Sequence, residues 1–497
     1  MTDRPAPRRV VVAGGGTAGW VTATALARQL GSLVEITLVE SEEIGTIGVG
    51  ESTIPTARAF HEFLKIDQQA FMRASRATFK LAISFENWAR DGDRYLHSFG
   101  TMPMRTWMAD FQHFWLEARA RGEAGEIGQY YLEHEAARLH RMDLKGDPKL
   151  NYAYHLDASL YAKFLRRIAE NDGVTRIEGK IANVERDGES GDIAALVLED
   201  GTRLTGDLFI DCTGFRSLLL GQTLGTPFED WGKWLPTNSA WATQSEGVGD
   251  AYPYTRAIAH GGGWQWRIPL QHRMGAGFVY ASDHMEAQPA LDQFLATLEG
   301  RPLRDPFPIR FRTGRHRQAW VGNCVGIGLA GGFVEPLEST TIHLIMIGIT
   351  RLLQLFPFSP DCAAQRERFN ELSQNEIERV RDFIILHYHL TERDDTSFWQ
   401  YMRNLDVPDT LRERMEAFAQ GAQAWQSTNE IFRVDSWIQV LLGQRMTPQG
   451  WNRVGALMKD GRLKQTMEDA SRMVANRVAT MQSHQQFIDS YCAPKEG

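Results

Sequence analysis

The stretch RRVVVAGGGTAGWVTATALARQLGSLVEITLVE, Arg8 to Glu40, decides the fold. A β-branched run, a glycine-rich turn, an apolar helix and a second buried strand follow one another, which predicts one strand–loop–helix–strand unit. The turn has the pattern G-x-G-x-x-G, in which glycine lets backbone N–H groups approach a pyrophosphate at a helix N-terminus. An acid that ends the second strand binds ribose hydroxyls, and a glycine turn without a ligand would leave that acid unexplained. The predicted dinucleotide site consists of Gly14, Gly16, Thr17, Ala18, Gly19 and Glu40.

The composition is that of an ordinary globular enzyme. The 497 residues are 43% apolar and 23% charged, which allows a large core and excludes long disorder. A net charge of −8 argues against a general nucleic-acid binder, because such a protein presents a basic face. The four cysteines form no CxxC pair and no Cys/His cluster at metal-ligand spacing, so we predict a reduced protein without a metal site. A polar leader that runs directly into a strand, and the lack of an apolar run of about 20 residues, predict a cytoplasmic protein without a membrane helix.

The predicted secondary structure changes near residue 345, from mixed helix and strand to mostly helix. Residues 56 to 90 look helical at first, and residues 150–172 predict a short strand followed by a strong helix. Residues 174–214 alternate strands with ESG and EDG turns, which is typical of a β-meander. Residues 230–330 predict further mixed sheet, and long amphipathic stretches predict mostly helix after about residue 340.

Two further runs favour FAD over NAD. DLFIDCTGF, Asp207 to Phe215, resembles the strand and glycine turn with which FAD domains of the glutathione-reductase and hydroxylase type return to the cofactor. GVGEST, Gly48 to Thr53, resembles the glycine loop beside the flavin, which adds Gly50, Glu51 and Ser52 to the predicted cofactor site. No second G-x-G-x-x-G of comparable quality is present, so reduced flavin would come from a separate flavin reductase.

The predicted fold is therefore α/β. Residues 1–345 form an FAD-binding domain of the glutathione-reductase and hydroxylase type with a mixed sheet, which includes substrate-facing segments near 78–115. Residues 346–497 form a mostly helical region that caps the substrate.

The most specific signal is the run Trp264-Gln265-Trp266-Arg267-Ile268-Pro269. It resembles the W-x-W-x-I-P hallmark of the flavin-dependent tryptophan halogenase family. Further blocks resemble that family in the expected order: GGGTAGW (Gly14 to Trp20), GVGEST, TFKLAISFENW (Thr78 to Trp88), YLHSFG (Tyr95 to Gly100), YHLDASLYAKFLR (Tyr154 to Arg166) and GFVEPLEST (Gly332 to Thr340). The resemblance implies an FADH2-dependent halogenase that uses oxygen and chloride or bromide to halogenate an electron-rich aromatic ring.

Lys80 is the predicted halogen-delivering residue. Halide and aromatic carbon are both electron-rich, so halide must first be oxidised. In the family, halide attacks a flavin hydroperoxide, and a lysine in the substrate site receives the hypohalous acid as a hydrogen-bonded species or a haloamine. Lys80 matches that lysine, and its neighbours Phe79, Leu81 and Ile83 suit a partly desolvated, more reactive amine. The alternative is a solvated surface lysine.

Glu338 matches the family's catalytic carboxylate, which orients the halogenating species and helps to remove the ring proton. The alternative is a helix-entry acid beside Ser339, which would stabilise the helix by at most about 1 kcal/mol. Ser339, Thr340 and Thr341 resemble the loop whose backbone amides hold the halide. We assign Thr340 and Thr341 to the halide and Ser339 to the substrate, although tryptophan-specific members have glycine at the position of Thr341.

Trp264, Trp266, His97 and Phe99 are the remaining predicted substrate residues. The resemblance implies that the two tryptophans wall the substrate cavity from the flavin side, and that His97 and Phe99 contact the substrate ring. The alternatives are core packing for the tryptophans and a structural role for His97.

The resemblance fails in the block that holds the amino-acid part of tryptophan. Tryptophan-specific members use a Tyr-Tyr pair, a glutamate and an F-R-N-F-W run. In AWQSTNEIFRVDSWIQVLLG, Ala424 to Gly443, only Glu430, Phe432 and Arg433 echo this pattern. We infer that the amino-acid clamp is missing and that indole or another electron-rich aromatic is the substrate.

Two other functions are weighed against halogenation. A flavin monooxygenase would need no remote lysine, and a Gly-Asp flavin-ribose signature is not evident near GLAGGF. A non-catalytic flavin-binding relative would consume oxygen without product. The sequence leaves open a carrier-bound substrate and the oligomeric state, for which a homodimer is one alternative.

Overall fold

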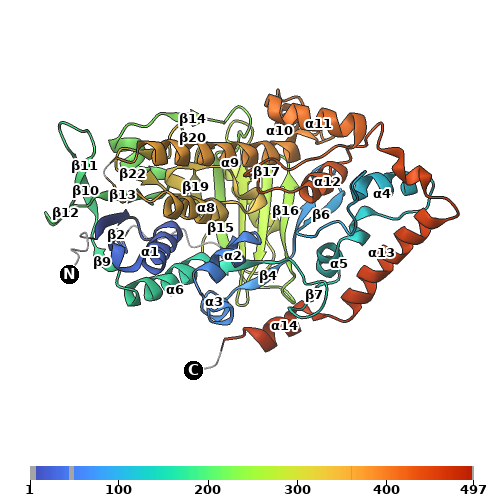
Figure 1. Cartoon of the computed structure of the whole chain (residues 1–497), viewed down its shortest axis with the longest axis horizontal. Coiled ribbons are helices and arrows are strands. Elements are labelled where there is room, and N and C mark those ends of the chain that lie inside the picture. The colour runs from blue at the N-terminus through green and yellow to red at the C-terminus, as the bar shows by residue number, and fades with distance from the viewer. Residues whose placement is uncertain (1–6, 44–49, 360, 495–497) are drawn as a thin grey trace. The chain divides into compact units, whose positions relative to one another are not determined.

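The computed structural model describes residues 7–43, 50–359 and 361–494 (Figure 1). The chain forms two compact units, each assembled from three segments. Unit 1 comprises Met1–Ala77, Leu156–Leu235 and Phe311–Glu378, and unit 2 comprises Thr78–His155, Pro236–Arg310 and Arg379–Gly497.

Unit 1 is built on a six-stranded sheet with the strand order β21-β22-β13-β1-β2-β9. Its strands are β1 (Arg8–Ala13), β2 (Val34–Glu40), β9 (Thr175–Glu178), β13 (Leu208–Asp211), β21 (Trp320–Val321) and β22 (Cys324–Gly326). β1 pairs in parallel with β2 and β13, and α1 (Thr17–Leu30) follows β1 directly. The predicted strand–loop–helix–strand unit is therefore confirmed, and the crossover helix connects two parallel neighbours as parallel pairing requires.

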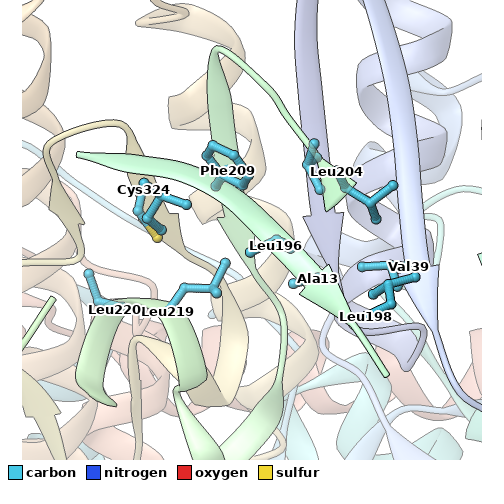
Figure 2. Packing of buried hydrophobic residues seen from close by; sticks show 11 residues of the cluster. Ala13, Val39, Leu196, Leu198, Leu204, Phe209, Leu219, Leu220 and Cys324 are labelled. Atoms are coloured by element: carbon cyan, nitrogen blue, oxygen red, sulfur yellow. The ribbon is translucent and has the colours of Figure 1, made fainter. Parts of the chain in front are cut away.

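The predicted β-meander is confirmed for its middle part, whereas the strands at its two ends, β9 and β13, belong to the parallel sheet. The middle part forms the three-stranded sheet of β10 (Ile181–Arg186), β11 (Ile193–Leu198) and β12 (Arg203–Leu204). Leu196, Leu198 and Leu204 of this sheet belong to one buried cluster with Ala13 and Phe209 of the parallel sheet (Figure 2). Each such side chain stabilises the fold by roughly 1.5–3 kcal/mol when fully buried, so the meander is packed onto the cofactor-side sheet.

Helices and a small sheet complete unit 1. They are β3 (Gly50–Ser52), α2 (Thr56–Phe63), α3 (Gln68–Ala74), α6 (Ala158–Asn171), β14 (Phe228–Asp230), β20 (Gly314–His316), β23 (Gly332–Phe333), α8 (Thr341–Gln354) and α9 (Ala363–His389), which begins in this unit. Both α6 and α8 pack against α1. The predicted boundary near residue 345 falls inside α8. The whole of this helix belongs with the cofactor-side elements, because it packs against α1.

Unit 2 is built on a seven-stranded sheet with the order β19-β15-β18-β17-β16-β5-β6. Its strands are β5 (Ala82–Glu86), β6 (Arg94–Ser98), β15 (Ser239–Ser245), β16 (Tyr254–His260), β17 (Gly263–Pro269), β18 (Met274–Tyr280) and β19 (Phe307–Arg310). Every residue of β17 and β18 is buried. A Cβ atom added to Gly277 would lie 2.0 Å from the Trp266 ring, so glycine makes room for this tryptophan on the paired strand.

Only the first part of residues 56–90 is helical, and the helices end at Ala74. Helices α2 and α3 are present, but TFKLAISFE forms β4 (Thr78–Lys80) and β5. β4 pairs antiparallel with β8 (Ala153–Asp157), and β5 pairs with both β6 and β16. These pairings with distant residues outweigh the helical preference of the preceding segment.

The remainder of unit 2 is mostly helical, as predicted for the C-terminal region. The elements are α4 (Phe111–Ala120), α5 (Leu132–Arg138), β7 (Arg141–Met142), α7 (Ala287–Thr297), α10 (Ser397–Arg403), α11 (Asp409–Gly421), α12 (Val434–Gly443), α13 (Arg462–Ala479), β24 (Gln482–Ser483) and α14 (His484–Tyr491). Within the residues that the structure describes, none of the helices is long and apolar enough to span a membrane.

Candidate active site

The glycine loop between β1 and α1 has the shape of a pyrophosphate cradle. Gly14 has a φ of 106°, and a Cβ atom there would lie 2.4 Å from the Cys212 carbonyl oxygen. A Cβ on Gly19 would lie 1.8 Å from the Gly14 carbonyl oxygen, so both positions require glycine. A Cβ on Gly16 would meet nothing within 4 Å, and no described side chain caps α1. The open face at Gly16 and the uncapped N–H groups of Thr17 and the residues after it fit the pyrophosphate of FAD.

Glu40 lies over this loop. Arg176 Nε donates to Glu40 Oε1 at 2.6 Å, and Trp20 Nε1 donates to Glu40 Oε2 at 3.3 Å. A Cβ on Gly15 would lie 1.5 Å from Glu40 Oε2. A carboxylate has more acceptor positions than these two bonds use, so Glu40 keeps capacity for ribose hydroxyls. Sequence reasoning missed Arg176, because it approaches from β9, 136 residues along the chain.

The Gly50–Ser52 strand supplies a carboxyl group that titrates near neutral pH. Burial raises the pKa of Glu51 from 4.5 to about 7. Ser52 and Thr53 are buried beside it. Gly48 and Val49 of the GVGEST run lie outside the described residues.

The residues predicted to hold the halide form a tight turn at the start of α8. Glu338 is 1% exposed and is followed by Ser339, whose φ of 59° is left-handed. Thr340 precedes α8 without a side-chain cap, and its buried Oγ1 has no hydrogen-bond partner among the described residues. Uncapped first-turn N–H groups and an unpartnered hydroxyl together fit a small anion. Thr341 is the first residue of the helix.

Lys80 is fully buried, which rules out the solvated surface lysine. Its Nζ atom lies 5.3 Å from the centroid of the Phe99 ring. The backbone explains this approach, because the Phe99 N–H donates to the Leu81 carbonyl oxygen at 2.9 Å where β6 ends beside β5. Two predicted site residues are therefore brought together within unit 2.

His155 is a neighbour of Lys80 that sequence reasoning missed, although it lies in the quoted YHLDASLYAKFLR block. Its ring lies between two hydroxyl groups, with Nδ1 3.1 Å from Thr78 Oγ1 and Nε2 3.0 Å from Thr255 Oγ1. Burial and the charge of Lys80 hold the pKa of His155 well below its ordinary value. Lys80 is thus accompanied by a neutral imidazole.

The aromatic candidates line the interior of unit 2. His97 is buried in β6, with its ring centroid 5.6 Å from that of Phe383 and 6.4 Å from that of Phe432. Trp264 and Trp266 are both buried in β17, with ring centroids 6.2 Å apart. The Trp264 indole N–H is buried without an acceptor among the described residues, so core packing leaves one polar group of this tryptophan unsatisfied.

The C-terminal block, Ala424 to Gly443, forms hydrogen bonds with other residues of unit 2. Arg433 Nη2 donates to the Phe99 carbonyl oxygen at 3.2 Å, and Asp435 Oδ1 accepts from the Met102 N–H at 2.7 Å. Gln439 bonds Ser98 through both ends of its amide, accepting at 2.9 Å and donating at 3.1 Å. These bonds hold the segment that carries the predicted ring contacts. The spacing of the block contained no signal for them, because the partners lie more than 300 residues away.

The predicted residues therefore fall into two sets. The cofactor residues and Glu338 to Thr341 belong to unit 1, whereas Lys80, His97, Phe99, Trp264 and Trp266 belong to unit 2.

A family comparison identifies this arrangement. The family model described as tryptophan halogenase matches residues 9–460. The chain belongs to the tryptophan halogenase family. Tryptophan 6-halogenase SttH of Streptomyces toxytricini is 38% identical over 441 residues, which are 82% of this chain and 83% of that protein.

Solved structures similar to this halogenase agree with the family. Xcc4156, a flavin-dependent halogenase from Xanthomonas campestris, is 50% identical with a TM-score of 0.97, and 99% of each chain is covered. BrvH, a flavin-dependent halogenase from Brevundimonas sp. BAL3, is 40% identical with a TM-score of 0.94, over 99% of this chain and 100% of that chain. The α/β fold and the enzyme class predicted from sequence are confirmed: the chain is a flavin-dependent halogenase.

Proposed function

We propose that this halogenase uses FADH2 from a separate flavin reductase, oxygen and chloride or bromide to form a hypohalous species that Lys80 delivers to an indole-like aromatic ring. The observation that carries the proposal is the fully buried Lys80 amine, 5.3 Å from the Phe99 ring centroid. A lysine that served only solubility would lie in water.

The unit 1 residues would hold the cofactor and the halide. Gly14, Gly16 and Gly19 would approach the pyrophosphate of FAD, and Glu40 the ribose. When bound, reduced FAD supplies the electrons that activate oxygen. The first-turn N–H groups at Thr341, with the Thr340 hydroxyl, would keep the halide in place, because the Thr340 side chain does not cap the helix and its hydroxyl has no described partner.

The unit 2 residues would handle the halogenating species. The Lys80 amine donates a hydrogen bond to hypohalous acid, which polarises the oxygen–halogen bond towards the substrate. Transfer of the positive halogen to a ring carbon releases hydroxide, which leaves as water after protonation. Glu338, which belongs to unit 1, would accept the proton that the ring then loses, which would restore aromaticity. Phe99 and His97 would contact the ring face.

The substrate we propose lacks an amino-acid head group. Glu430, the acid that echoes the tryptophan clamp, has no exposed side-chain surface and pairs with Arg414 at 2.7 Å. Arg433 is bonded to the Phe99 carbonyl oxygen. Glu430 is therefore not available for the ammonium group of an amino acid, so a neutral ring such as indole is favoured over free tryptophan.

The test combines the purified chain with FAD, a flavin reductase, NADH, oxygen and either chloride or bromide. Indole and tryptophan are supplied separately, and products are measured by mass spectrometry. Halogenated indole with little halogenated tryptophan supports the proposal. Oxygenated indole that forms equally without halide would replace it with a monooxygenase, and oxygen consumption without product would indicate a non-catalytic relative.

A further inference from the structure

His343 joins two segments of unit 1 that the proposed reaction uses. Its Nδ1 atom lies 2.9 Å from Thr56 Oγ1, and its Nε2 atom lies 2.9 Å from Glu376 Oε1. Thr56 is the first residue of α2, four positions after Ser52, and His343 is the third residue of α8. One imidazole therefore connects the start of α2, four residues after Ser52, to the first turn of the predicted halide-binding helix.

The Glu376 carboxylate is buried and ionised. His343 is 5% exposed and Glu376 is 3% exposed, and Arg351 pairs with Glu376 Oε2 at 2.5 Å. Burial alone would raise the pKa of Glu376, but the hydrogen bonds and charges of His343 and Arg351 lower it below the ordinary value. The ionised Glu376 carboxylate accepts from His343 Nε2, and His343 Nδ1 is hydrogen-bonded to the Thr56 hydroxyl. The orientation of the ring is therefore fixed from both ends.

We propose that His343 is a positioning residue that holds the halide-binding turn, Glu338 to Thr341, in register with the flavin-side segment, Gly50 to Ser52. The inference rests on the proposed function, because it assigns the halide to that turn. A displacement of about 1 Å between reacting groups costs roughly 100-fold in rate, so a hydrogen bond between α2 and α8, the helices that follow the two segments, has a catalytic consequence. His343 touches neither ligand in this account and acts through α2 and α8.

The Thr56 hydroxyl allows the contact to be broken without disturbing the core. Thr56 is exposed and begins a helix, so Thr56→Val removes only the hydrogen bond, whereas Thr56→Ser keeps it. Thr350→Val is the matched control, because that hydroxyl donates within α8 to the Met346 carbonyl oxygen. His343→Gln keeps an N–H group for Glu376 and removes the ring nitrogen that bonds Thr56.

The experiment measures KM for bromide, kcat, and peroxide released per halogenated product. Thr56→Val should raise KM for bromide about five-fold, as expected for one lost hydrogen bond, and should release more peroxide. Thr56→Ser and Thr350→Val should match the wild type. The double variant Thr56→Val/His343→Gln should be no worse than His343→Gln alone, because both remove one contact. Additive effects, or a wild-type KM in Thr56→Val, would overturn the proposal.

Hydrogen–deuterium exchange separates this proposal from the proposed function. Thr56→Val should exchange faster than wild type at the amides of residues 341–344, while Thr350→Val should not, with the unfolding temperature unchanged in both. If the wild type fails to halogenate, the proposed function is wrong, and the exchange data still decide whether His343 holds the turn. Equal exchange in all three proteins would contradict the positioning role.

Discussion

Arg414 and Glu430 form a buried ion pair, in which Arg414 Nη2 donates to Glu430 Oε2 at 2.7 Å. The Glu430 side chain has no exposed surface, and its other oxygen accepts from Trp437 Nε1 at 3.0 Å. The Arg414 guanidinium lies 4.3 Å from the Trp437 ring centroid. A glutamate at the position that echoes a substrate clamp therefore stabilises the C-terminal block itself.

Removing one partner of this pair should lower the free energy of unfolding without changing which substrate the enzyme prefers. Arg414→Met leaves Glu430 buried without its cation, so we expect the free energy of unfolding to fall by about 3–5 kcal/mol, measured by denaturant titration. Glu430→Gln keeps the shape and should cost less. The ratio of kcat/KM for indole to that for tryptophan should stay the same in Glu430→Gln. A ratio that changes ten-fold would mean that Glu430 meets the substrate.

Lys80→Ala should lower halogenation by roughly 100-fold or more, because the delivering amine is lost. Lys80→Met, which keeps the buried volume, should have the same effect. Flavin binding, measured by fluorescence quenching, should change by less than about two-fold because Lys80 is not one of the predicted FAD-binding residues. The matched control is Lys163→Ala, an exposed lysine on α6, which should retain full activity. Product from Lys80→Met at more than half the wild-type rate would exclude the delivery role.

Thr340→Val tests the halide-binding turn. The substitution removes the buried hydroxyl that has no described partner but leaves the first-turn N–H groups of α8. Loss of one hydrogen bond to an anion should raise KM for bromide by roughly 3–10-fold with little change in kcat. Steady-state kinetics with bromide as the varied substrate measure this effect. An unchanged KM would assign the halide to another site.

Glu51 should make the stability of the flavin-free protein depend on pH. Its folded pKa of about 7 lies above the ordinary value of 4.5, so the folded state binds this proton more tightly. The stability that Glu51 contributes is fully present below pH 4.5 and is lost as pH rises through 7. Because Glu51 is partly exposed, we expect the loss to be about 1–3 kcal/mol, and Glu51→Gln should not show it. Unfolding curves of both proteins from pH 5 to pH 8 measure the difference, and parallel curves would contradict it.

Local pattern predicted the cofactor side of unit 1 well. The strand, glycine turn and helix from Arg8 to Leu30 depend on neighbouring residues, and the meander depends on turns that are visible in the sequence. The contacts of Glu40 with Arg176 and of Phe99 with Arg433 join residues 136 and 334 positions apart. No periodicity carries such information.

The strands formed by TFKLAISFE show the same limit of prediction from local pattern. Lys80 and its neighbours become strand because β8, β16 and β6 supply their hydrogen bonds. The roles of Lys80 and Glu338 came from family resemblance, while the structure adds that Lys80 is buried beside Phe99 and a neutral His155. The interleaved order of the two units, each built from three segments, was likewise not predictable from local pattern.

The most direct test of the account is the mass of the product formed from indole with bromide, FAD, a flavin reductase, NADH and oxygen, for the wild type beside Lys80→Met. Delivery of the halogen by Lys80 predicts bromoindole, recognised by the bromine isotope doublet, from the wild type only, and no such product when bromide is omitted. Equal amounts of bromoindole from both proteins would show that free hypohalous acid in solution performs the reaction, which would contradict delivery by Lys80. Hydroxylated indole in place of bromoindole would contradict the halogenation chemistry itself.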